Sequence, residues 1–187
     1  MIFCTFIANF LTMKISEIPL LEVWQRGPVK DIPPLLQPIA HALLQAKEEL
    51  NLLMINFPDN LLWIKPVGLA SPAFHLQHLS GVLDRVFTYA RNEKLNDVQL
   101  LQLNAEDELF IQGVTLNKLL NRFNLQVGVA LQQLKTTNEQ TLTDIRGVGR
   151  KLIPSTVIGL LMHAAEHTMR HLGQLIVTVK IIQASKY

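Results

Sequence analysis

The sequence predicts an all-α protein, an up-and-down four-helix bundle with an additional N-terminal segment. Three observations support this prediction. Apolar residues recur at helical spacing in four long segments, prolines and hydroxyl residues mark where these segments begin, and no long alternating run of β-branched residues appears. The chain has 187 residues, of which 49% are hydrophobic, so it can bury one core and is not intrinsically disordered.

The first two helices begin at proline signals. The first is predicted over residues 35–56, directly after a pair of prolines. The second follows Ser71, an N-cap residue with Pro72 at the first helical position, and runs to about Arg91. The polar stretch 92–109 then leaves room for one short helix.

The last two helices follow threonine signals. Thr115 is the predicted N-cap of a helix that fades near Thr136, and residues 141–154 are predicted to be a connection because they contain two glycines. The last helix is predicted to open at 154–156 and to continue to about Gln183. Since no linker or repeat divides the chain, we expect one bundle domain over residues 35–187, with residues 1–34 as an extension.

The N-terminal residues and the overall charge limit the function classes. Residues 1–12 are apolar, but they lack the basic start and the cleavage site of a signal peptide and are too short to cross a bilayer. Whether the functional start is Met1 or Met13 stays open. With no membrane span and with Cys4 alone unable to form an internal disulfide, we expect a cytoplasmic protein. A formal net charge of +2 gives no indication of nucleic-acid binding.

Three of the six histidines lie at intervals of four in the last helix: His163, His167 and His171. Each step of four residues turns the helix by only about 40° beyond a full turn, so neighbouring imidazoles can point at one ion. The two outer histidines are about 12 Å apart along the axis, too far to share an ion. The metal-binding pair is therefore 163 with 167, or 167 with 171.

Apolar neighbours at helical spacing predict that these histidines face the bundle interior, where imidazoles must be hydrogen-bonded or coordinated. His75 and His78 lie three residues apart near the start of the second helix. One of them together with a pair from the last helix gives a three-histidine site with open positions, as catalytic metal sites have. The residues alone leave open whether His75 or His78 is the third ligand.

Protease and nucleotide motifs are absent. The segment from His167 to His171 carries Thr168 where zinc proteases of the H-E-x-x-H type need a glutamate, which excludes that class. The sequence also contains no G-x-S-x-G, phosphate-binding loop or dinucleotide fingerprint.

The string HAAEHTMRHLGQ, taken with the upstream SPAFHLQHLSGVLDR, resembles the DinB/YfiT-like superfamily of bacterial four-helix-bundle proteins. The resemblance covers about residues 35–182 and selects His78, His167 and His171 as metal ligands. The chain departs from the family pattern at Leu172, where a basic residue is often found.

The resemblance implies a divalent metal ion, zinc or nickel, and a small-molecule substrate. It also implies thiol-dependent S-transfer with a low-molecular-weight thiol such as bacillithiol or mycothiol as co-substrate. Metal-dependent hydrolysis is the alternative enzyme activity, and a non-catalytic metal-binding or stress-response module is the alternative outside catalysis. No catalytic residue can be assigned from the sequence.

Four residues are expected beside the ligands: His163, His75, Gln174 and Arg85. For Arg85 an internal ion pair is favoured over a contact with an anionic substrate, and Glu106 has no partner that the sequence identifies. Low charge and a mean hydropathy of +0.23 predict an exposed apolar face, and we expect a two-fold homodimer.

Overall fold

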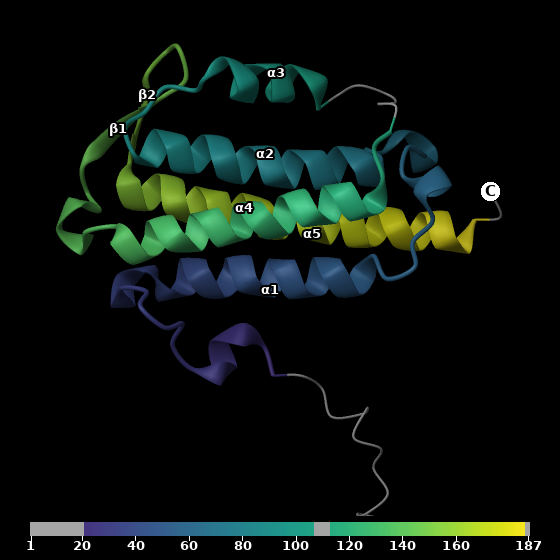
Figure 1. Cartoon of the computed structure of the whole chain (residues 1–187), viewed down its shortest axis with the longest axis horizontal. Coiled ribbons are helices and arrows are strands. Elements are labelled where there is room, and N and C mark those ends of the chain that lie inside the picture. The colour runs from purple at the N-terminus through teal and green to yellow at the C-terminus, as the bar shows by residue number, and fades with distance from the viewer. Residues whose placement is uncertain (1–20, 107–112, 186–187) are drawn as a thin grey trace, which may run out of the picture.

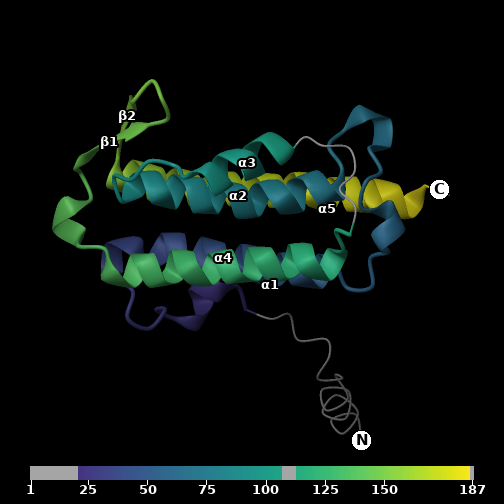
Figure 2. The same ribbon diagram turned by 45° about the horizontal axis from the view of Figure 1, so that its top comes forward.

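The computed structural model describes residues 21–106 and 113–185, and it confirms that the protein is mostly helical (Figure 1). Within these residues four long helices lie side by side: α1 (Gln37–Leu53), α2 (Pro72–Ala90), α4 (Leu116–Thr136) and α5 (Val157–Ala184) (Figures 1 and 2). The shorter α3 (Asp97–Ala105) packs on the outer side of α2. Short 3-10 turns lie in the connections: η2 (Val23–Arg26), η3 (Pro34–Leu36), η4 (Asp59–Leu61), η5 (Pro66–Gly68) and η6 (Glu139–Thr141).

The helices do not follow a strict up-and-down order. α2 and α4 run in the same direction, opposite to α1 and α5, because α3 carries the chain back along α2 before α4 begins (Figures 1 and 2). Near the C-terminal ends of α2 and α4, Gln133 Nε2 donates to the Phe87 carbonyl at 3.0 Å. The prediction of an up-and-down order is wrong in this respect.

Hydroxyl caps begin three of the long helices. The Ser71 side chain accepts a hydrogen bond from Phe74 N at the start of α2, as predicted, and Thr115 caps α4 in the same way. Thr156 accepts from Gly159 N, so α5 begins one residue after the predicted opening. Each cap satisfies one of the backbone N–H groups that a helix start leaves without a partner.

The predicted connection before α5 contains a β-hairpin, which an all-α prediction did not include. Its strands β1 (Ile145–Val148) and β2 (Ile153–Thr156) pair antiparallel. The turn uses the left-handed backbone conformation at Gly149 (φ 67°), which glycine adopts without strain. Arg146 Nε donates to the Ala90 carbonyl at 3.0 Å and so ties the hairpin to the end of α2.

An aliphatic core fills the space between the long helices. Leu43, Leu83, Phe123 and Leu161, one from each long helix, are fully buried there. Outside the core, η2 packs on α1, and the Val23 N–H donates to Gln45 Oε1 at 2.8 Å. The apolar residues 1–12 and the question of Met1 or Met13 lie outside the described residues. Among the described helices, none has the length and hydropathy needed to cross a bilayer.

Candidate metal centre

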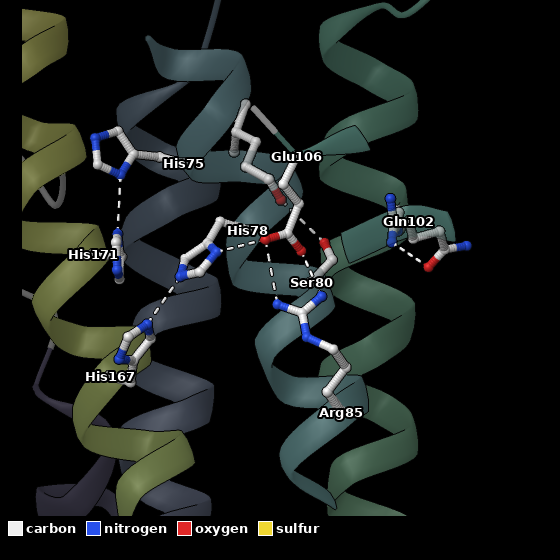
Figure 3. Close-up of polar contacts among 10 residues, drawn as sticks. His75, His78, Ser80, Arg85, Gln102, Glu106, His167 and His171 are labelled. Carbon is white, nitrogen blue, oxygen red and sulfur yellow. Dashed lines mark hydrogen bonds and ion pairs between the residues drawn. The ribbon is translucent and has the colours of Figure 1, made fainter. Parts of the chain in front are cut away.

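Antiparallel packing of α2 on α5 brings four histidines together (Figure 3). His78 from α2 and His167 and His171 from α5 each offer a ring nitrogen, and these three nitrogens lie within 4.8 Å of one another. His78 Nε2 lies 2.9 Å from His167 Nε2. The sequence pattern thus converges in space at His78, His167 and His171.

His75, the alternative third ligand, lies on the other side of His171. It is buried, with 3% of its surface exposed, and its Nδ1 is 3.2 Å from His171 Nδ1 (Figure 3). The structure therefore brings His78 into the three-nitrogen group and places His75 as a hydrogen-bond partner of His171.

Glu106, at the end of α3, is a site residue that the sequence did not reveal. Its Oε2 lies 2.7 Å from His78 Nδ1, and Arg85 Nη1 donates to its Oε1 at 2.6 Å. Burial raises the pKa of Glu106, but the hydrogen bonds from His78 and Arg85 outweigh burial and lower the pKa below its usual value. The internal ion pair that the sequence favoured for Arg85 is thus present, and its partner is Glu106.

Three of the histidines at the site, His75, His167 and His171, are neutral imidazoles at neutral pH. Burial, followed by repulsion from neighbouring histidines, lowers the pKa of His75, His167 and His171 to about 4 each. Neutral imidazole is the form that coordinates a metal ion, so protons compete weakly for these nitrogens at pH 7.

His163 corrects the expectation that all three α5 histidines face the interior. Its side chain is 52% exposed, because the 40° offset per four residues accumulates and turns one end of the row toward solvent. His163, Glu166 and His167 form a second group with ligand atoms within 4.8 Å of one another. In that group Glu166 is exposed and already paired with Arg170, which favours the His78 group as the metal site.

Cavities adjoin the histidines on two sides. One of about 520 Å³ lies between α2, α5 and the hairpin and is lined by His78, His163 and His167 among mostly apolar side chains such as Val82 and Ile153. Another, of about 550 Å³, is lined by residues that include His75, Arg170 and Gln174. Gln174 therefore lines the same cavity as His75 and does not line the cavity beside His78 and His167.

The donor set fits a transition-metal ion of the kind expected. Imidazole nitrogens suit zinc, nickel and similar divalent ions, and three protein ligands leave a coordination position open. Among the described residues, His167 Nδ1 is buried and has no hydrogen-bond partner. The ring is held instead through its other nitrogen, Nε2, which faces His78 Nε2 at 2.9 Å.

Comparison with known proteins decides the family. The sequence profile of the DinB superfamily matches residues 24–175. The chain belongs to the DinB superfamily. A crystal structure described as the conserved protein of locus from Enterococcus faecalis has a similar fold, with a TM-score of 0.63 at 18% identity, over 80% of this chain and 98% of that one. No curated protein matches the sequence.

Proposed function

We propose that His78, His167 and His171 bind one divalent cation, zinc or nickel, and that this DinB superfamily chain uses the site for thiol-dependent S-transfer. The observation that carries the proposal is the convergence of three ring nitrogens from two helices within 4.8 Å. The lowered pKa values of His167 and His171 support it, because both rings are neutral at pH 7.

The chemistry follows from an open, partly buried site. A divalent cation bound there would hold a thiol as its thiolate near neutral pH. The cavity beside His78 and His167 offers about 520 Å³ of largely apolar space for an organic electrophile. In the transfer the sulfur forms a bond to carbon, and the leaving group departs with the electron pair and takes up the proton that the thiol lost.

Metal loading tests the first part of the proposal. Metal-free protein incubated with zinc or nickel and then desalted should retain about one ion per chain, measured by elemental analysis. His167→Ala should lose the ion because it removes a central nitrogen of the group. His41→Ala is the matched control: His41 lies on α1 and contacts the Gly27 carbonyl at 3.1 Å, so this variant should load like the wild type.

Thiol binding tests the second part. Cobalt-substituted protein titrated with bacillithiol, mycothiol, glutathione and a simple thiol should develop a thiolate-to-cobalt charge-transfer band with at least one of them. If no thiol produces the band at millimolar concentration, the S-transfer proposal is overturned, and water activation for hydrolysis becomes the better assignment.

A further inference from the structure

The carboxylate of Glu106 has no role in the proposed function as stated above, yet it is one of the most constrained groups near the site. Its side chain is 7% exposed, and it is bound on one side by His78 and on the other by Arg85 (Figure 3). A buried charge of this kind is costly unless it is paired and hydrogen-bonded, which Glu106 is.

Arg85 determines the protonation state of the Glu106 carboxylate. A guanidinium is always protonated and can only donate, and both carboxylate oxygens accept from it, at 2.6 and 3.3 Å. The carboxylate is therefore ionised and can only accept hydrogen bonds. Since Oε2 also lies 2.7 Å from His78 Nδ1, that nitrogen must carry the hydrogen of the contact.

The position of this hydrogen determines what His78 can bind. A neutral imidazole with its hydrogen on Nδ1 has a free lone pair on Nε2. Nε2 is the atom that faces His167 in the three-nitrogen group, at 2.9 Å. His78 is thus held in the tautomer that a cation in this group needs, before any cation arrives.

The backbone of α2 leaves space for this arrangement at Gly81. A β-carbon on Gly81 would lie 2.2 Å from Glu106 Oε1 and 2.5 Å from Arg85 Nη1. Glycine inside a helix is unfavourable by about 1 kcal/mol relative to alanine. Here it makes room for the Arg85–Glu106 pair one helical turn from His78.

We propose that Glu106 is a positioning residue for the metal site, which holds His78 as the Nδ1–H tautomer with Nε2 directed at the cation. This inference rests on the proposed metal site. It adds that α3, which supplies no ligand, is required for strong binding because its last turn delivers the carboxylate.

The test compares the wild type with the double variant Glu106→Leu with Arg85→Met. Removing both charges together avoids leaving one buried and unpaired, so the variant should fold, which circular dichroism checks. Long-range ¹H–¹⁵N correlation spectra of metal-free protein at pH 7.5 report the tautomer of His78, and competition with a chelator gives the affinity for zinc. Glu166→Gln is the matched control. It removes a carboxylate that lies near His163 and His167, and this carboxylate makes no hydrogen bond to His78.

We expect His78 to be the Nδ1–H tautomer in the wild type and in Glu166→Gln. In the double variant the Nε2–H form should appear and zinc should bind about 10- to 100-fold more weakly. Glu166→Gln should change the affinity less than about fivefold. An unchanged tautomer or an unchanged affinity in the double variant overturns the inference. If the wild type binds no zinc, the proposed metal-binding function is wrong. The tautomer of His78 in the metal-free protein is a separate measurement, and it still shows whether Glu106 positions the ring.

Discussion

Acidification should destabilise the metal-free protein through its buried histidines, and His75 gives the clearest case. Its pKa is lowered from 6.5 to about 4 by burial and by repulsion from His78. The unfolded chain therefore takes up a proton at a higher pH than the folded protein does. The stability that neutral His75 provides is complete above about pH 6.5 and is lost as the pH falls toward 4.

The magnitude follows from these two pKa values. At pH 5 the histidine is almost fully protonated in the unfolded chain and mostly neutral in the folded protein, which integrates to a loss of about 2 kcal/mol relative to pH 7.5. The low exposure of His75, 3%, means that solvent screening reduces this value little. His167 and His171 add to the loss, but less per group, because both are partly exposed to solvent.

Urea unfolding of the wild type and of His75→Gln, both with chelator present, isolates this contribution. The free energy of unfolding of the wild type should fall by about 2 kcal/mol more than that of the variant between pH 7.5 and pH 5. Any loss of packing in the variant is the same at both pH values and cancels in this comparison. His171 acts in the same direction, because removing His75 removes a repulsion that lowers its pKa. Equal losses of stability in the two proteins would refute the reasoning.

The remaining predictions concern helix positions. Gly128→Ala on α4 meets nothing within 4 Å and should raise the free energy of unfolding by about 0.5–1 kcal/mol, whereas Gly81→Ala should lower it because its β-carbon would displace the Arg85–Glu106 pair. Urea titrations of both variants check this, and stabilisation by both would contradict the role given to Gly81. Ser71→Ala should cost about 1 kcal/mol through loss of the cap on Phe74 N. A melting temperature equal to that of the wild type would show that the cap contributes nothing.

The sequence predicted those parts of the fold that depend on local signals. The caps at Ser71 and Thr115 were readable because a hydroxyl residue directly preceded an apolar period of 3.6. The direction of α4 could not be predicted from the sequence, because it depends on how α3 packs along α2 and no local sequence pattern indicates this packing. The hairpin was missed because each strand has only four residues, too few for an alternating pattern to stand out around Gly147 and Gly149.

In the candidate site, too, the residues that local sequence signals identify differ from those that only packing brings together. The spacing of four residues along one helix predicted that His167 and His171 could bind one ion, and the family resemblance added His78 as the third ligand. Glu106 lies 28 residues from His78 in the sequence, at the end of a different helix, and only packing joins the two. The exposure of His163 could have been anticipated by carrying the helical offset over two steps instead of one.

The ring nitrogens of the site and the wall of the adjoining cavity come from separately encoded parts of the chain. His78 and His167 project from core helices, whereas Val148 and Ile153 reach the same cavity from the hairpin. Surface hairpins accept substitutions and changes of length that core helices do not. Sequence changes in the hairpin can therefore alter the shape of this cavity while His78 and His167 stay in place, and mutagenesis confined to residues 145–156 is the direct way to vary the cavity wall alone.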